Sequence, residues 1–350
     1  MNKTVVLGMS GGVDSSVSAI ILMKEGYNVI GVTMKLWDSD KTAEEDAKEV
    51  CRKLGIEHHV VDFSQEFKRY VIEDFKNKYI NAKTPNPCVE CNRFLKFGAL
   101  FDKAMELGAD FIATGHYCKI EFSTKYNQYV LEKSDELNKD QSYFLYNIRK
   151  EVLPHIIFPL EKFKSKDEIR KIAKDYGLVV ADKKDSQEIC FIPNDNYIDF
   201  LNSSLSKEEK SIAMKQGCIL DCNGCKRGKH NGIINYTVGQ RKGLGIQNEK
   251  PLYVKNISVE KNEIVVGEKE EIYYKTIFAS ELNWLVDIDF SKTLEVQAKI
   301  RYLAKPANAI ITFIDGLAKI DFEEAQMAPT PGQSIVFYDG QIVIGGGKIV

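Results

Sequence analysis

The segment Ser10–Ser16, SGGVDSS, restricts the fold of this chain more than any other stretch. It follows the apolar run 4–9, which has the length of a buried strand, and precedes residues 17–23, whose apolar side chains recur at helical spacing. A strand, a glycine turn and a helix N-terminus form an anion-binding geometry, because glycines let the backbone approach and free N–H groups point at the anion. The segment therefore predicts a phosphate site.

The sequence pattern excludes two common phosphate-binding loops. A Walker loop needs a lysine, and the dinucleotide fingerprint needs glycines in the pattern G-x-G-x-x-G, and SGGVDSS has neither. The segment instead resembles the pyrophosphate loop of the PP-loop ATP pyrophosphatases, which split ATP between its α and β phosphates. The alternative at this point is an ordinary serine-capped helix after a glycine turn.

The hydrophobic period changes along the chain and predicts an α/β fold followed by β domains. Apolar strands are expected at 4–9, 27–35, 59–63 and 110–115, alternating with helices at 43–54 and 94–107. This alternation is typical of a doubly wound parallel sheet with ligands at the carboxyl ends of its strands. The predicted domains are a PP-loop nucleotide-binding domain with a helical extension (1–205), a central β-rich domain (206–272) and a C-terminal β-barrel (273–350).

Composition narrows the class of protein. The 350 residues carry 48 basic and 50 acidic side chains, so any nucleic-acid surface must be a local patch. No apolar run approaches the length of a membrane span, and the N-terminus leads into a strand rather than a signal peptide. A cytoplasmic protein without a membrane partner is expected. Its eight cysteines then favour catalysis or metal binding over disulfides.

The second chemical signal is the segment 84–92, TPNPCVECN. Its prolines disfavour helix before them, so Cys88 and Cys91 are expected where a loop becomes a helix. A helix start lowers the pKa of a thiol, and the thiolate is the reactive species. Cys190, in KDSQEICFI at 184–192, is a third candidate.

Six motifs give the chain a more specific resemblance. They are SGGVDSS (10–16), TPNPCVECN (84–92), ATGHY (113–117), KDQSYFL (139–145), KDSQEICFI (184–192) and YTVGQRKGLGI (236–246). Their order and spacing resemble the bacterial tRNA-specific 2-thiouridylases over nearly the whole chain. In that family ATP adenylates the C2 oxygen of the wobble uridine in tRNAs of the Lys, Glu and Gln type. A protein persulfide then displaces AMP and leaves 2-thiouridine.

The resemblance implies roles for individual residues. ATP is expected at Gly8, Met9, Ser10, Gly11, Gly12, Val13, Asp14 and Ser15, with adenosine contacts at Met34 and Gly115. Mg²⁺ would offset the phosphate charge. Cys190 matches the persulfide-bearing cysteine and Cys91 its partner nucleophile, which implies a Cys91–Cys190 disulfide on product release. A sulfur-donor protein, either a persulfide relay or a cysteine desulfurase, is the implied partner.

The resemblance also implies contacts with tRNA, whose single-stranded loops expose bases that proteins can read. The wobble uridine is expected near Asn86, Pro87 and Cys88, and the anticodon loop near Lys139, Asp140 and Gln141. Further tRNA contacts are implied at His116, Arg301, Tyr302 and Gln333.

At one position the chain departs from the family pattern, because Cys88 stands where the motif N-P-D-x-x-C has its aspartate. Cys88, Cys91 and Cys190 would suit a 4Fe–4S cluster that binds sulfide at its unique iron, as in some related PP-loop tRNA thiolases. The persulfide route needs only Cys91 and Cys190, with Cys88 a resolving thiol or spectator. The sequence gives no distances, so both sulfur routes stay open.

A separate cysteine group, Cys218, Cys222 and Cys225, lies outside the catalytic motifs. With His230 as a fourth ligand it would form a small structural zinc site. The alternative is three loop thiols around an Asn-Gly turn.

Three other functions are weighed against the thiouridylase. Another PP-loop adenylating synthetase would share SGGVDSS but leave the cysteines unexplained. A noncatalytic, metal-stabilised RNA-binding protein would bind RNA regardless of ATP and of Cys190. An ATP-binding redox sensor would couple Cys91 to Cys190 without transferring sulfur.

Overall fold

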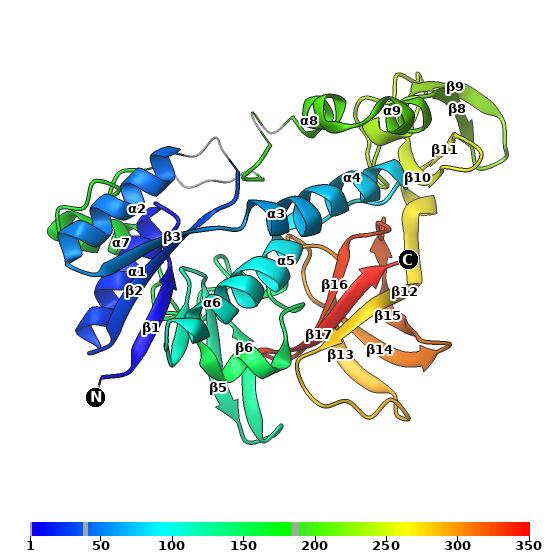
Figure 1. The fold of residues 1–350 in the computed structure, drawn as a ribbon. Coiled ribbons are helices and arrows are strands. Elements are labelled where there is room, and N and C mark those ends of the chain that lie inside the picture. The colour runs from blue at the N-terminus through cyan, green and yellow to red at the C-terminus, as the bar shows by residue number, and fades with distance from the viewer. Residues whose placement is uncertain (1, 38–40, 184–188, 193, 195) are drawn as a thin grey trace.

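The computed structural model describes residues 2–37, 41–183, 189–192, 194 and 196–350 (Figure 1). Its N-terminal part is a five-stranded parallel sheet with the strand order β3-β2-β1-β4-β7. The strands are β1 (Thr4–Gly8), β2 (Asn28–Lys35), β3 (Glu57–Asp62), β4 (Phe111–Ala113) and β7 (Ile156–Ile157). The first four are the strands predicted from the sequence, with their ends shifted by one or two residues.

Helices pack on both faces of this sheet, which confirms the predicted doubly wound fold. Val5 and Leu7 of β1 pack on one side with α1 (Val13–Lys24), α2 (Lys41–Leu54) and α7 (Lys166–Asp175). Val6 points to the other side, where it joins a core shared with the helices of residues 64–106. Those helices are α3 (Ser64–Phe67), η1 (Lys68–Ile72), α4 (Glu73–Ile80), α5 (Pro87–Glu90), η2 (Cys91–Ala99) and α6 (Leu100–Glu106).

The helical extension predicted at the end of domain 1–205 consists of short elements. The region from 142 to 213 contains the 3-10 turns η3 (Ser142–Phe144) and η4 (Lys150–His155) and, besides α7, the helices α8 (Tyr197–Ser204) and α9 (Lys207–Ala213). Among the described residues, no helix combines the length and the apolar composition that a membrane span requires.

The central part is a mixed four-stranded sheet with the order β10-β11-β8-β9. Its strands are β8 (Gln216–Asp221), β9 (Lys226–Asn231), β10 (Tyr253–Ser258) and β11 (Glu263–Gly267), flanked by the turns η6 (Ile233–Asn235) and η7 (Lys269–Ile272). Ile219, Val254 and Ile264 form its own small core.

The C-terminal part is the predicted barrel, built from six antiparallel strands. They are β12 (Tyr273–Trp284), β13 (Leu294–Lys299), β14 (Ala307–Ile314), β15 (Leu317–Met327), β16 (Ser334–Asp339) and β17 (Ile342–Ile349). Pairing of β12 with β17 closes the barrel. Ile277, Ile311 and Phe337 fill its interior.

One hairpin joins the N-terminal part to the barrel. β5 (Cys118–Ser123) and β6 (Gln128–Lys133) form an antiparallel pair, and β6 continues the barrel sheet by pairing with β17 at Glu132–Ile342 and Leu131–Val343. The sequence analysis did not predict this hairpin. The first and third parts of the chain therefore share one sheet (Figure 1).

Candidate functional site

The predicted phosphate loop connects β1 to α1 at the carboxyl end of the sheet. Gly12 caps α1 in an extended conformation (φ −103°, ψ 166°) with no side-chain cap. The first N–H groups of α1 therefore have no intrahelical acceptor and are available to an anion. The hydroxyls of Ser15 and Ser16 donate to the Gly12 carbonyl at 3.1 and 2.8 Å, which holds the loop in shape.

Two glycines let the backbone close around this loop. Gly11 has φ 67°, and a Cβ at this position would lie 2.2 Å from the Ala43 carbonyl oxygen. Gly115 follows β4, and a Cβ there would lie 3.1 Å from the Ser15 nitrogen. The predicted adenosine residue Gly115 is thus packed against the phosphate loop, whereas Met34 lies half-buried near the carboxyl end of β2.

Lysines surround the loop. Lys166 Nζ lies 2.5 Å from Asp14 Oδ2, and the Tyr117 hydroxyl donates to Asp14 Oδ1 at 2.9 Å. Lys183 Nζ donates to the Gly11 carbonyl at 3.0 Å. Neither lysine belongs to the motifs singled out in the sequence. Lys166 neutralises the charge of Asp14, which is the only carboxylate of the segment 10–16. The loop therefore does not repel the negative charge of a phosphate group.

Lys139, predicted to contact tRNA, lies beside this loop. Its Nζ is buried without a hydrogen-bond partner among the described residues and lies 5.1 Å from the centroid of the Tyr117 ring. Its neighbours in the KDQSYFL motif are held inside the fold. Asp140 accepts from the Ser142 hydroxyl at 2.8 Å, and Gln141 Oε1 accepts from the Tyr117 N–H at 3.0 Å. Their predicted tRNA contacts stay predictions.

The residues at the loop suit a cation that arrives with the nucleotide. Mg²⁺ is usually held by one or two carboxylates together with phosphate oxygens and water. Asp14 is the carboxylate in position for this role. In the described part of the chain no group of three or more His, Cys, Asp and Glu side chains is arranged to hold a metal ion.

The three cysteines of the predicted sulfur site come from two segments. Cys88 lies in α5, Cys91 begins η2, and Cys190 lies in the loop between α7 and α8; all three are free thiols. The charges of Cys91 and Cys88 both raise the pKa of Cys190, so the three thiols lie in one neighbourhood. Residues 184–188 of the KDSQEICFI motif lie outside the described residues.

The expectation of a lowered cysteine pKa is wrong for this structure. Burial raises the pKa of the Cys88 and Cys91 thiols, and it raises the pKa of Cys190 to about 12. Cys88 and Cys190 remain exposed to solvent, but the protein around them removes enough water to favour the neutral thiols. Cys88 and Cys91 lie near the start of the helical run α5–η2–α6, but burial is the largest influence on both thiols and outweighs the helix N-terminus.

One cation opposes the effect of burial on the pKa of these thiols, and it was not predicted from the sequence. Lys96 lowers the pKa of Cys88, Cys91 and Cys190 through its charge. It follows Cys91 by five residues, the hydrogen-bonding repeat of a π-helix, and η2 is a π-helix. A search at the usual helical spacing of three or four residues does not find it.

Lys96 also faces His116, a predicted tRNA contact. Lys96 Nζ lies 3.4 Å from His116 Nε2, and Thr114 Oγ1 lies 2.7 Å from His116 Nδ1. Burial, and then the charge of Lys96, hold the pKa of His116 well below its usual range, so the imidazole is neutral. The Lys96 ammonium donates a hydrogen bond, so His116 Nε2 is the unprotonated nitrogen that accepts it. The other ring nitrogen, Nδ1, then carries the hydrogen and donates to Thr114 Oγ1.

The raised pKa of Cys190 predicts a pH dependence. A raised pKa keeps the thiol protonated at neutral pH, so alkylation of Cys190 by iodoacetamide is expected to quicken about tenfold per pH unit from pH 7 to 9. Peptide mass spectrometry measures the rate, with the exposed Cys225 in the same sample as the reference thiol. A plateau below pH 9 would contradict the prediction.

Neither predicted metal site fits the structure. Cys88, Cys91 and Cys190 are not arranged as a ligand set in the described residues, so the structure does not support an iron–sulfur cluster held by these thiols. At the predicted zinc site, Cys222 Sγ donates to the Val266 carbonyl at 3.6 Å. His230, the suggested fourth ligand, is buried with both ring nitrogens bonded to backbone. Cys218 and Cys225 therefore belong to the β8–β9 hairpin and its turn.

The other predicted tRNA residues gather where the barrel meets the segment 84–91. Asn86 and Pro87 are both buried. Tyr302 packs against Phe144 with ring centroids 4.5 Å apart. Arg301 is exposed and donates to the Met327 carbonyl, and Gln333 donates to the carbonyls of Thr84 and Pro85.

Three family models match the chain. They are described as a tRNA methyl transferase HUP domain (residues 3–194), a tRNA methyl transferase PRC-barrel domain (206–268) and an aminomethyltransferase beta-barrel domain (274–349). Among solved structures, the U34-tRNA thiolase NcsA from Methanococcus maripaludis with its [4Fe-4S] cluster is 21% identical with a TM-score of 0.37, covering 60% of this chain and 70% of that chain. A likeness this low does not bear on whether this chain holds a cluster.

Curated relatives match from end to end. The tRNA-specific 2-thiouridylase MnmA of Acetivibrio thermocellus is 46% identical and covers 99% of both chains. The protein of the same name from Clostridium acetobutylicum is 48% identical over the full length of both. These relatives belong to the family that the six sequence motifs resemble. The chain belongs to the family of the tRNA-specific 2-thiouridylases.

Proposed function

We propose that this chain catalyses the ATP-dependent 2-thiolation of the wobble uridine in tRNAs of the Lys, Glu and Gln type. The observation that carries the proposal is the joint presence of an anion-binding loop before α1 and three neighbouring thiols, among them Cys91 and Cys190. Identity of 46–48% along the whole chain to tRNA-specific 2-thiouridylases supports the same activity. A cytoplasmic location is proposed with it, because the tRNA substrate is found there.

The first half-reaction is adenylation. The uracil O2 attacks the α-phosphorus of ATP, the bond to the bridging oxygen breaks, and pyrophosphate leaves. The free N–H groups of α1 and the lysines around the loop stabilise the charge on pyrophosphate as it develops. Adenylation converts the uracil oxygen into a good leaving group, since AMP departs far more easily than hydroxide.

The second half-reaction is sulfur transfer. The terminal sulfur of a Cys190 persulfide attacks C2, the C2–O bond breaks and AMP leaves. Cys91 then attacks the Cys190 sulfur, which forms a Cys91–Cys190 disulfide and releases 2-thiouridine. A thiol reductant must reduce that disulfide, and a sulfur-donor protein must reload the persulfide. Lys96 would stabilise each thiolate as it forms, because its charge already lowers the pKa of both thiols.

The proposal is tested on protein purified without oxygen and assayed for iron, sulfide and zinc. This preparation is incubated with ATP, unmodified tRNA and a persulfide donor, and 2-thiouridine is measured by mass spectrometry of the nucleosides. We expect product from iron-free protein, and none when a non-cleavable α,β-methylene ATP analogue replaces ATP. A requirement for about four irons per chain would overturn the persulfide route. If neither the iron-free nor the iron-containing protein forms 2-thiouridine with ATP, the proposed activity is overturned and another PP-loop adenylation is favoured.

A further inference from the structure

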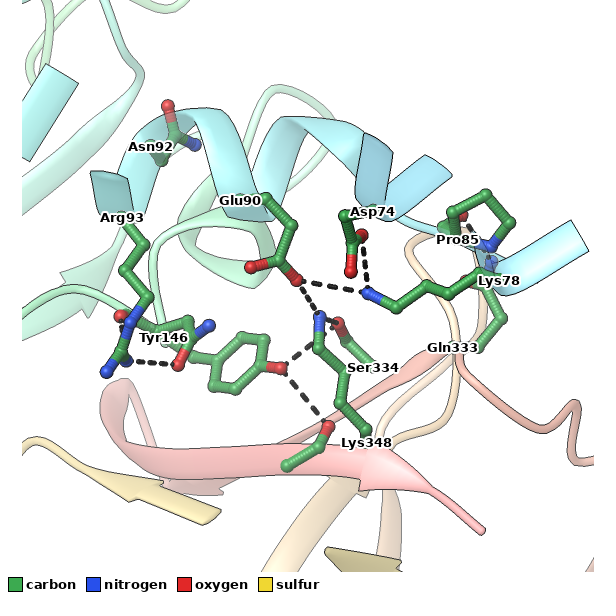
Figure 2. A network of polar contacts seen from close by, with 12 residues as sticks. Asp74, Lys78, Pro85, Glu90, Asn92, Arg93, Tyr146, Gln333, Ser334 and Lys348 are labelled. Carbon is green, nitrogen blue, oxygen red and sulfur yellow. Dashed lines mark hydrogen bonds and ion pairs between the residues drawn. The ribbon is translucent and has the colours of Figure 1, made fainter. Parts of the chain in front are cut away.

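The C-terminal barrel contacts the segment that carries Cys91 at several points (Figure 2). We propose that Gln333 and Lys348 of the barrel are positioning residues for Cys91. The inference rests on the proposed function in taking Cys91 as a nucleophile. It goes beyond that function because it makes the barrel part of the sulfur-transfer site.

The first contact is with the loop before α5. Thr84 N–H donates to the Pro331 carbonyl at 2.8 Å. Gln333 Nε2 lies 3.2 Å from the Pro85 carbonyl oxygen (Figure 2). It also lies 3.4 Å from the Thr84 carbonyl oxygen. Gly332 between them has φ 85°, and a Cβ on it would lie 3.0 Å from the Thr84 oxygen. The turn 331–333 therefore packs directly on the loop and fixes the approach to Cys88 and Cys91.

The second contact is a buried ion pair beside Cys91. Lys348 of β17, 4% exposed, places its Nζ 2.7 Å from Glu90 Oε1. Lys78 joins the pair, 3.4 Å from Glu90 Oε1 and 2.7 Å from Asp74 Oδ2 (Figure 2). Burial alone would raise the pKa of Glu90, but Lys348 and Lys78 hold it below its usual value. The carboxylate is charged and fixed between two ammonium groups.

The residues after Cys91 are fixed as well. Asn92 Nδ2 donates to the Phe144 carbonyl at 3.0 Å. Arg93 Nη1 donates to Asn147 Oδ1 at 2.7 Å and reaches Asn283 Oδ1 of β12 at 3.4 Å. Contacts to the barrel and to the KDQSYFL region thus hold the helix on both sides of Cys91.

These contacts hold the start of the helix that carries Cys91. α5, η2 and α6 follow one another without a gap from Pro87 to Glu106, and such a helix takes most of its stability and its position from tertiary packing. A buried ion pair is a weak source of stability compared with apolar packing, but its partners must meet in one geometry. Gln333 and Lys348 therefore act through the position of the cysteine segment.

Two roles are possible for Gln333: contact with tRNA, which the sequence predicts, and positioning of Cys91. A residue that only contacts tRNA changes binding of tRNA and leaves the free protein unaltered. A positioning residue changes the environment of Cys91 before any tRNA is added. Thiol reactivity of the free protein therefore distinguishes them.

The test measures iodoacetamide alkylation of Cys91 in the full chain without tRNA, for Gln333→Ala and for the control Gln326→Ala. Gln326 lies on β15 of the same barrel and donates to the Glu324 carbonyl of its own strand. We expect the Cys91 rate to change at least about fivefold in Gln333→Ala and less than twofold in the control. We expect kcat for thiolation to fall about tenfold or more with KM for tRNA within about threefold, because small misplacements of reacting groups are costly.

Lys348 gives an independent arm of the same experiment. Lys348→Arg keeps the charge and is expected to retain most of the wild-type Cys91 rate, whereas Lys348→Met loses the pair with Glu90 and should behave as Gln333→Ala. If Lys348→Met does not fold, Gln333→Ala carries the test. An unchanged Cys91 rate in Gln333→Ala, with only KM for tRNA raised, would overturn the inference. Because alkylation requires no thiolation, this result would be distinct from failure of the proposed function.

Discussion

Replacing either Cys91 or Cys190 with serine is expected to abolish 2-thiouridine formation, with a loss of about 10³-fold or more. A serine hydroxyl cannot carry a persulfide, and it is a far poorer nucleophile than a thiol at neutral pH. The reason is chemical rather than structural, because serine and cysteine differ little in size. The measurement is 2-thiouridine per tRNA after a single turnover, by mass spectrometry of the nucleosides.

Three companion measurements make this result specific. Binding of tRNA should be retained in both variants, and Cys225→Ser should keep full activity, since Cys225 lies in the exposed turn after β8. Cys88→Asp restores the residue of the common family motif, and the persulfide route predicts that it is tolerated. Thiolation by Cys91→Ser or by Cys190→Ser would contradict the mechanism.

The substitution Gly11→Ala is expected to lower the rate of tRNA-dependent AMP formation from ATP by about 10²-fold. Alanine at φ 67° is strained, and its Cβ would lie 2.2 Å from the Ala43 carbonyl oxygen, so the loop backbone must move. The N–H groups of α1 move with it, and displacement of binding groups by about 1 Å costs about that much in rate. Release of radiolabelled AMP measures the effect.

The control Gly108→Ala separates the effect of backbone strain at a positive φ from the effect of moving the phosphate loop. Gly108 has φ 72°, so alanine is strained there to a similar degree, but a Cβ would meet nothing within 4 Å. We expect this control to lower the melting temperature modestly and to keep AMP formation. Equal loss of AMP formation in both variants would mean that strain alone, and not the loop position, explains the Gly11 result.

The features that were predictable from sequence are those that depend on neighbours in the chain. A parallel strand covered on both faces is a continuous apolar run, so β1 and β2 are readable, and the loop after β1 is a local motif. The barrel was predictable as a class because its strands are short and separated by turn residues.

What the sequence did not predict depends on contacts between distant segments. Lys96 reaches the thiols through π-helical spacing, and Lys166 reaches Asp14 from another helix. The role of Lys348 is visible only once β17 lies beside α5. The predicted zinc site is wrong for a related reason, since the carbonyl of Asn262, from a distant part of the chain, already bonds to His230 Nε2. Spacing alone does not reveal that competition.

The pairing of β6 with β17 has a consequence for how this protein is made. β17 is the last strand in chain order, and it pairs with β6, pairs with β12 to close the barrel, and carries Lys348. During translation, the edges of β6 and β12 therefore stay open until β17 leaves the ribosome, and open edges are templates for aggregation. Chains stopped before residue 342 would lack both the closing strand and the barrel partner of Glu90, Lys348. Synthesis of β17 is thus coupled to assembly of the segment that carries Cys91, and truncated products are expected to be inactive.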